Sequence, residues 1–146
     1  ARIEELRALA DEFDVIRRVV FHGPVEPGGR FEYIHRADIC LLPLTDTGLG
    51  GRYTSPLKLF EYMAAGKAII VSDLPSMRQV LTPEQNALLV PSGEPEAFAQ
   101  AIERLLTDSG LRTRLGDAAK SRAQAFSWRA RSETIQRFIA GRLRNT

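Results

Sequence analysis

The chain has 146 residues, 44% of them hydrophobic, with a formal net charge of +2 and an isoelectric point near 9.0. A chain of this size and composition is long enough to form one globular domain with a proper core. Its single cysteine, Cys40, excludes an internal disulfide, and the apolar run around it predicts a small buried hydrophobe. No stretch has the length of a membrane span and no signal-peptide pattern is present, so we expect a soluble, cytoplasmic protein.

Much of the basic excess lies near the C-terminus. Nucleic-acid binding is one interpretation of such a cluster. The arginines are scattered along a predicted helix, however, with Glu133 among them and few aromatic residues. We therefore expect a solvated helix face and no nucleic-acid partner. The arginines are Arg129, Arg131, Arg137, Arg142 and Arg144.

In chain order, the first two thirds of the sequence alternate helices with short apolar strands. Apolar residues at helical spacing predict a helix over 2–13, and a strand is predicted over 19–22, ended by Gly23 and Pro24. The next elements are predicted as a short helix from about 29 to 36, a strand over 39–44, a central helix, a strand over 68–72, a short helix over 74–81 and a strand over 87–90.

After residue 93 the pattern is purely helical. An acidic first turn with an early proline opens one helix at residue 94. A second is predicted over 109–125, and Ser127 is expected to cap a third. Trp128 is expected to anchor this last helix in the core.

This order of elements predicts the fold class. Short apolar strands that alternate with helices indicate a mostly parallel sheet of about four strands, covered on both faces. The predicted fold is a Rossmann-like α/β three-layer sandwich with extra C-terminal helices. We expect one domain over 1–146, in which 94–146 forms the C-terminal helices.

The stretch 45–73 has the features most typical of a binding site. Its glycines let the backbone turn and let another molecule approach closely. Ser55 is expected as the N-cap and Pro56 as the first residue of a helix of about ten residues, which ends at Gly66. Because ligands bind beyond the carboxyl ends of parallel strands, a helix that starts there favours a phosphate group.

Two side chains of this helix do not fit a pure packing role. Lys58 lies near the positive end of the helix dipole, where a cation costs a few tenths of a kcal/mol to about 1 kcal/mol unless an anion is bound. Glu61 shares a face with Lys58, because the two are three residues apart. The alternative interpretation is an exposed salt bridge between them, worth about 0.2–0.5 kcal/mol.

Four other polar residues receive structural interpretations. Asp46 and Asp73 follow predicted strands, where functional residues collect, and we expect them to cap turns. His22 and His35 have no nucleophile or acid at a telling spacing, so we expect structural roles for both.

Several segments resemble one protein family. SPLKLFEYMAAGKAIIVSDLPSMRQVL resembles the donor-binding segment of the retaining glycosyltransferases of family 4, the group 1 glycosyltransferases with the two-lobed GT-B fold. RRVVFHGPV is similar to the family's strand-plus-glycine turn and RADICLLPL to its next strand. The segment from NALLVPSGEPEAF to FSW resembles its C-terminal helices. The resemblance covers nearly the whole chain and implies an N-terminally truncated C-terminal lobe, which binds the nucleotide sugar.

The resemblance also implies roles for individual residues. Glu61 matches the glutamate that bonds the ribose hydroxyls, and Lys58 belongs to the helix start that faces the donor diphosphate, so these two are the candidate catalytic residues. The glycine loop would approach the sugar, and the turn after the first strand would lie near the base. The implied donor-binding residues are Gly23, Val25, Gly50, Gly51, Arg52, Tyr53, Thr54, Ser55, Pro56, Leu57, Lys58 and Glu61.

The sequence departs from the family pattern in two ways. Tyr53 stands eight residues before Glu61, where the family usually has a second glutamate that touches the transferred sugar. The strand, helix and strand that open the family's C-terminal lobe are also missing. In the family's strand order they lie between the 19–22 strand and the others. We therefore expect 19–22 either to pack beside 39–44 or to pair with another chain, because an open sheet edge invites association.

The resemblance implies the donor-binding lobe of an enzyme that transfers a sugar from a nucleotide diphosphate, such as a UDP- or GDP-sugar, to a hydroxyl acceptor with retention. We expect the fragment itself to be inactive. Such enzymes generally use no metal in the chemistry, so no cofactor is expected besides the donor substrate. The expected partners are this donor and the missing N-terminal lobe. Peripheral membrane association of the full enzyme and a homodimer through the sheet edge stay open, as do two other functions: a non-catalytic nucleotide-binding module and a nucleotide-sugar epimerase.

Overall fold

The computed structural model of the chain describes residues 2–26, 28–46 and 56–143. The backbone contacts divide the chain into two compact units, residues 1–30 and 31–146.

The first unit contains helix α1 (Arg2–Glu12) and the short 3-10 helix η1 (Ile16–Arg18). Asp14, with a φ of 53°, reverses the chain after α1, and its N–H bonds the Asp11 carbonyl at 2.9 Å. This α1 confirms the helix expected over 2–13. Among the described residues of this unit, Ala10 is buried.

The strand predicted over 19–22 is wrong for this chain. Residues 19–26 have no regular secondary structure, and 19–22 do not belong to the sheet. The position of this segment beside 39–44 and its pairing with another chain both stay predictions. The physical reason is that an apolar, β-branched run supplies only a preference, while a strand needs a neighbouring backbone to bond. Val20 accordingly has 73% of its surface exposed.

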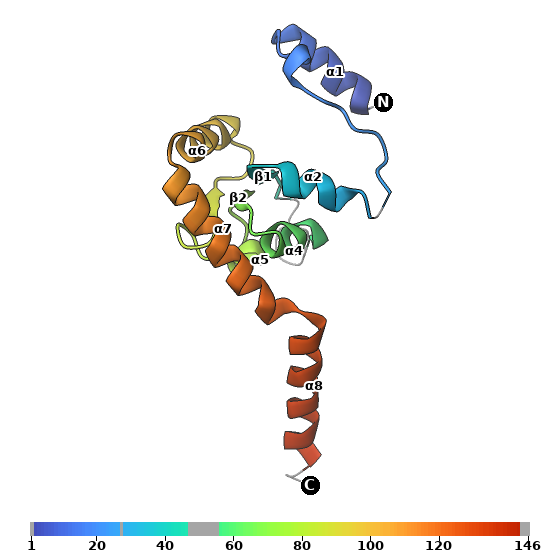
Figure 1. The fold of residues 1–146 in the computed structure, drawn as a ribbon, viewed down its shortest axis with the longest axis vertical. Coiled ribbons are helices and arrows are strands. Elements are labelled where there is room, and N and C mark those ends of the chain that lie inside the picture. Colours follow the sequence, from blue (N-terminus) through green and yellow to red (C-terminus); the bar gives the residue numbers. More distant parts are fainter. Residues whose placement is uncertain (1, 27, 47–55, 144–146) are drawn as a thin grey trace. The chain divides into compact units, whose positions relative to one another are not determined.

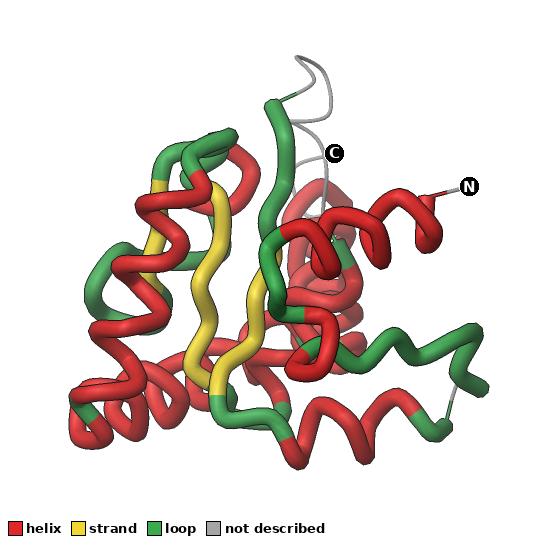
Figure 2. The backbone as a smooth tube through the Cα atoms, turned by 90° about the horizontal axis from the view of Figure 1, so that it is seen from above, coloured by secondary structure: helices red, strands yellow, loops and turns green. Residues whose placement is uncertain are grey.

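The second unit is built on a parallel sheet. Its strands are β1 (Ile39–Leu42), β2 (Ala68–Ser72) and β3 (Leu88–Val90), in the spatial order β1-β2-β3. Ile39 pairs with Ala68 and Ile70 pairs with Leu88. Figure 2 shows the three strands side by side. The predicted parallel α/β sheet is confirmed, with three strands in the described residues instead of about four.

Helices cover both faces of this sheet. One face packs Ile69 and Val71 against α4 (Leu57–Ala64), α5 (Pro75–Arg78) and one side of α7 (Ser109–Ala123). The other face packs Ala68 and Ile70 against α6 (Pro95–Thr107) and α7. All five residues of β2 are buried, as expected for a central parallel strand. The helix α2 (Arg30–Arg36) precedes β1 and buries Ile34.

The chain ends in α8 (Trp128–Leu143), which follows the 3-10 turn η2 (Gln124–Phe126). The Ala130 N–H donates to Ser127 Oγ at 3.2 Å, so the predicted serine cap is confirmed. Trp128 is not a core anchor, because 83% of its surface is exposed. Helical spacing identifies an apolar face but does not identify what covers it. Figure 1 shows α8 as the last helix of the chain.

Candidate functional site

The site expected from the sequence lies at the carboxyl ends of the strands, where two serines hold the exit of β1. The backbone N–H of Leu44 donates to Ser72 Oγ at 2.8 Å, and Ser92 Oγ donates to the Leu44 carbonyl, also at 2.8 Å. Ser72 ends β2 and is 1% exposed, and Ser92 follows β3. Three consecutive strand ends are thereby joined at the residue that leads into the glycine loop.

Helix α4 begins after that loop. Its N-cap is Pro56, with φ −69° and ψ 123°, and Leu57 is its first residue. The helix therefore starts one residue later than predicted, and Ser55 lies outside the described residues. A φ near −65° suits proline at either position, but the extended ψ of Pro56 places it before the helix. Leu59 N–H bonds the Pro56 carbonyl at 3.0 Å and closes the first turn.

The end of α4 is held by a glycine, as predicted. Gly66 has a φ of 68°, its N–H bonds the Met63 carbonyl at 2.9 Å, and the Lys67 N–H bonds the Tyr62 carbonyl at 3.1 Å. These two bonds form a Schellman motif. Lys67 Nζ also donates to the His35 carbonyl at 2.7 Å, which links this turn to α2. The C-terminal end of α4 is thus fixed from two sides.

Lys58 and Glu61 lie on the same side of α4, since they are three residues apart on one helix. The opposite side is the packed one, where Leu59 and Met63 are fully buried. Lys58 is exposed and Glu61 is half-buried. The ion pairs between described residues do not include one between these two side chains, so the simple surface salt bridge is not formed.

The first turn of α4 is open. Leu57 has 75% of its surface exposed, and the next residue, Lys58, is exposed as well. The described side chains therefore leave the N-terminal tip of the helix uncovered. A helix tip with free N–H groups and a positive dipole end can accept an anion.

Two groups near α4, the Cys40 thiol and the Tyr62 hydroxyl, have raised pKa values. Burial raises the pKa of the Cys40 thiol to about 11, although Lys67 opposes this shift. Burial raises the pKa of the Tyr62 hydroxyl, with smaller contributions from the Cys40 thiolate that forms at alkaline pH and from the charge of Glu61. Both groups are therefore protonated near neutral pH. Cys40 is a buried residue of β1, as predicted.

The structure brings only part of the predicted donor site together. Pro56, Leu57, Lys58 and Glu61 lie along the start of α4. The remaining predicted loop residues, 50–55, lie outside the described residues. Gly23 and Val25 belong to the first unit and are exposed.

Asp73 does not cap a turn as expected. Its two carboxylate oxygens accept bonds from Arg78 Nε and one terminal nitrogen, each at 2.6 Å. This bond to Asp73 raises the pKa of the already cationic Arg78. The carboxylate therefore ties the end of β2 to α5. The spacing of five residues, with a proline between, gave no helical signal for this pair.

Two surface hollows were not expected from the sequence. One, of about 410 Å³, lies at the carboxyl edge and is lined by Leu41, Leu44, Ser72, Phe98 and Ile102 among others. The other, of about 510 Å³, lies between the start of α4 and the start of α8. Neither is visible in sequence, because each joins residues from segments far apart in the chain.

No group of three or more histidine, cysteine, aspartate or glutamate side chains in the described ranges is arranged to hold a metal ion. None of the helices described is long and apolar enough to span a bilayer.

Comparison with known proteins supports the fold and shows the family. The family model described as glycosyl transferases group 1 matches residues 1–108. The D-inositol 3-phosphate glycosyltransferase of Xylanimonas cellulosilytica is 30% identical over 126 residues, which is 86% of this chain and 29% of that protein. The phosphatidyl-myo-inositol mannosyltransferase of Mycobacterium leprae is 31% identical over 134 residues, 92% of this chain and 34% of that protein.

Solved structures give the same fold. The sucrose-phosphate synthase of Thermosynechococcus elongatus superposes with a TM-score of 0.80 at 27% identity, over 98% of this chain and 35% of that one. Anabaena HepE in complex with UDP superposes with a TM-score of 0.78 at 19% identity, over 99% of this chain and 37% of that one, a likeness of fold alone. The chain spans about a third of the length of the relatives it matches. It is a partial GT-B lobe, and it belongs to the group 1 glycosyltransferases.

Proposed function

We propose that this chain is the donor-binding part of an enzyme that transfers a sugar from a nucleotide diphosphate sugar to a hydroxyl acceptor, with retention of the anomeric configuration. The observation that carries the proposal is the open first turn of α4, with Lys58 and Glu61 on the same side of that helix. This tip lies at the carboxyl edge of a parallel sheet, the usual ligand-binding edge of such folds.

Each group has a distinct task in this proposal. The N–H groups at the start of α4 and the ammonium of Lys58 stabilise the negative charge that grows on the departing diphosphate. The carboxylate of Glu61 accepts hydrogen bonds from the ribose hydroxyls and fixes the orientation of the nucleotide. A bound anion also relieves the unfavourable position of a lysine near the positive helix end.

The printed names of similar proteins suggest which donor and acceptor to test first. HepE was solved with UDP and with UDP-glucose, so UDP is the first nucleotide to test. Inositol-bearing acceptors come first because two relatives are named for inositol compounds. The chain spans a third of those proteins, so we propose that it binds the donor nucleotide weakly and does not turn over alone.

Isothermal titration of the chain with UDP, GDP and ADP tests the proposal. We expect one of them to bind, and Glu61→Gln or Lys58→Met to weaken that binding about 10- to 100-fold, since each removes a charge-assisted hydrogen bond. Glu103→Gln on the exposed side of α6 is the matched control and should bind like the wild type. Equal affinity in the wild type and both α4 variants would overturn the assignment.

A second function is a nucleotide-binding module without transferase activity. Tyr53 favours it, because it stands where the family pattern has the acid that touches the sugar. Transfer assays on a protein that includes the remaining two thirds of the relatives' length separate the two functions. Nucleotide binding without any transfer to inositol-bearing acceptors would favour the module.

A further inference from the structure

The exit of β1 is held by hydroxyl groups that follow both of the other strands. The sheet pairing between β1 and β2 ends at Leu42, which lies opposite Val71. Two residues later, the Leu44 N–H donates to Ser72 Oγ and the Leu44 carbonyl accepts from Ser92 Oγ, each at 2.8 Å. Side chains therefore replace the strand pairing at Leu44 and fix both of its backbone polar groups.

The bond from Ser92 requires the exits of β1 and β3 to approach each other. β2 lies between these strands, and two strands separated by a third are normally about 10 Å apart. A serine side chain and one hydrogen bond reach less far than this, so the exits of β1 and β3 converge over the end of β2. The Asp73 N–H also bonds the Val90 carbonyl at 2.7 Å, which joins the ends of β2 and β3.

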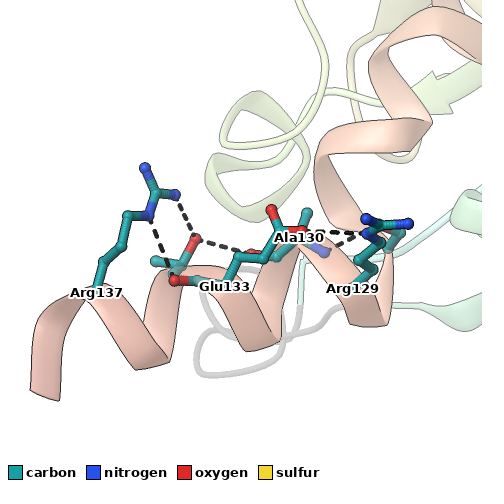
Figure 3. Close-up of polar contacts among 6 residues, drawn as sticks. Arg129, Ala130, Glu133 and Arg137 are labelled. Atoms are coloured by element: carbon teal, nitrogen blue, oxygen red, sulfur yellow. Dashed lines mark hydrogen bonds and ion pairs between the residues drawn. The ribbon is translucent and has the colours of Figure 1, made fainter. Parts of the chain in front are cut away.

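These serine bonds differ from the side-chain contacts on the helix surfaces. Ser72 is 1% exposed and Ser92 is half-buried, and their bonds to Leu44 span 28 and 48 residues of sequence. On α8, by contrast, the exposed Glu133 accepts bonds from Arg129 and Arg137 (Figure 3). Those partners are four residues apart on one helix, so their bonds fix no other element. The two serines instead join segments that are distant in sequence.

The serine bonds lie at the carboxyl edge of the sheet, where α4 also begins. From Leu44 the chain continues into the glycine loop, and the described residues resume at Pro56, the N-cap of α4. Leu44 is therefore the fixed point before the α4 tip, as Pro56 is the fixed point at the tip itself. A segment whose end is not fixed has more conformations, and a ligand that must order such a segment binds more weakly.

We propose that Ser72 and Ser92 are positioning residues of the donor site, which hold Leu44 so that the carboxyl edge is preorganised for the diphosphate of the nucleotide sugar. This inference rests on the proposed function, because it concerns the same α4 tip. Neither serine touches the nucleotide; both act through the backbone of Leu44. Preorganisation raises affinity because the ligand no longer has to order the chain.

Ser92→Ala is the first variant to test, because a half-buried hydroxyl can be removed with little loss of stability. We expect its affinity for UDP, or for GDP or ADP if one of those binds the wild type, to fall about 3- to 10-fold in isothermal titration. Ser92→Thr keeps the hydroxyl and should restore wild-type affinity. Ser72→Ala should give a similar or larger loss, measured at a temperature where circular dichroism shows that the variant is folded.

The matched control is Asn86→Ala. Asn86 is 6% exposed and its Oδ1 accepts the Thr82 N–H at 2.8 Å, so this variant removes the same kind of bond as Ser72→Ala. Asn86 precedes β3, however, and so lies at the amino end of the parallel sheet. We expect Asn86→Ala to lose stability and still bind the nucleotide like the wild type. A purely structural role of the serines would give both sites the same effect on binding.

Hydrogen exchange measured by NMR reports on the positioning itself. Coupling between two sites is reciprocal, so a ligand that depends on the Leu44 bonds must also strengthen them. We expect saturating UDP to slow exchange of the Leu44 amide about 3- to 10-fold more than exchange of the Thr82 amide, the same factor by which losing the bond weakens binding. Uridine lacks the diphosphate and should not produce this difference.

The outcomes separate this inference from the proposed function. Wild-type nucleotide binding with unchanged affinity in Ser92→Ala and Ser72→Ala would overturn the inference and leave the proposed function standing. An equal loss of affinity in Asn86→Ala, or equal protection of the Leu44 and Thr82 amides by UDP, would do the same. If the wild type binds none of UDP, GDP and ADP, the proposed function fails and this inference fails with it.

Discussion

Ser72 Oγ accepts a hydrogen bond from the backbone N–H of Leu44 at 2.8 Å, across 28 residues of sequence. Ser72 is 1% exposed, and the hydroxyl of Ser92 bonds the carbonyl of the same leucine. Both backbone polar groups of Leu44 are therefore held by side chains at the ends of neighbouring strands. This arrangement fixes where β1 leaves the sheet and where the glycine loop begins.

Ser72→Ala should destabilise the chain. The substitution leaves the half-buried Leu44 N–H without its acceptor, at a cost of about 1–3 kcal/mol. Urea unfolding followed by circular dichroism measures this loss. Ser121→Ala, on the exposed side of α7, is the control and should leave the unfolding midpoint nearly unchanged. If the two variants unfold at the same urea concentration, the bond to Leu44 does not hold the strand exit.

Gly116→Ala should destabilise the chain as well, for a steric reason. A Cβ at this position of α7 would overlap the backbone carbonyl of Gly66, at the turn between α4 and β2. A backbone atom cannot move aside as a side chain can, so a loss of about 1–3 kcal/mol or more is expected. Thermal unfolding measures it.

The matched control for this substitution is Gly141→Ala in α8. A Cβ at Gly141 meets no atom within 4 Å, and alanine favours a helix over glycine by about 1 kcal/mol. We therefore expect its melting temperature to be unchanged or slightly raised. A Gly116→Ala variant as stable as Gly141→Ala would show that α7 and the α4–β2 turn are not in close contact.

The sequence predicts the centre of the fold better than its ends. The strand over 68–72 is confirmed at both ends, because a continuous apolar run lies between the helix-ending Gly66 and the charged Asp73. The strand over 19–22 has a similar composition and does not form. What differs is the neighbouring backbone, which composition does not record. Trp128 shows the same limit for helices, since periodicity identifies an apolar face but not its partner.

The candidate site was likewise predicted in part. Helical spacing alone places Lys58 and Glu61 on one side of α4, and the structure agrees. The hydrogen bonds of Leu44 with Ser72 and Ser92, and the hollow beside α8, depend on contacts between residues far apart in sequence. Serine and apolar residues are too common for such contacts to leave a local motif.

The proposed donor site makes a prediction about metal. Its residues are a helix start, a lysine and a glutamate, which already supply positive charge to a diphosphate. We expect the affinity for UDP to change by less than about threefold, or about 0.6 kcal/mol, when EDTA replaces magnesium in the titration. A larger loss of affinity with EDTA would show that a cation bridges the protein and the diphosphate, contrary to the proposed chemistry.

The burial of Cys40 makes a prediction about alkaline stability. Burial raises the pKa of this thiol from 9.0 to about 11, so the folded state holds the proton more tightly than the unfolded chain. The free energy of unfolding from this group is therefore fully present below pH 9 and is lost as the pH rises from 9 to 11. Urea unfolding across this pH range should show a decrease in stability that is smaller in Cys40→Ala, after correction for its different stability at pH 8.

The thiol should also react with a disulfide reagent at pH 8 only when urea unfolds the chain, since the protonated, buried form is not nucleophilic. Rapid labelling of the folded chain at pH 8 would contradict this burial of Cys40 in β1.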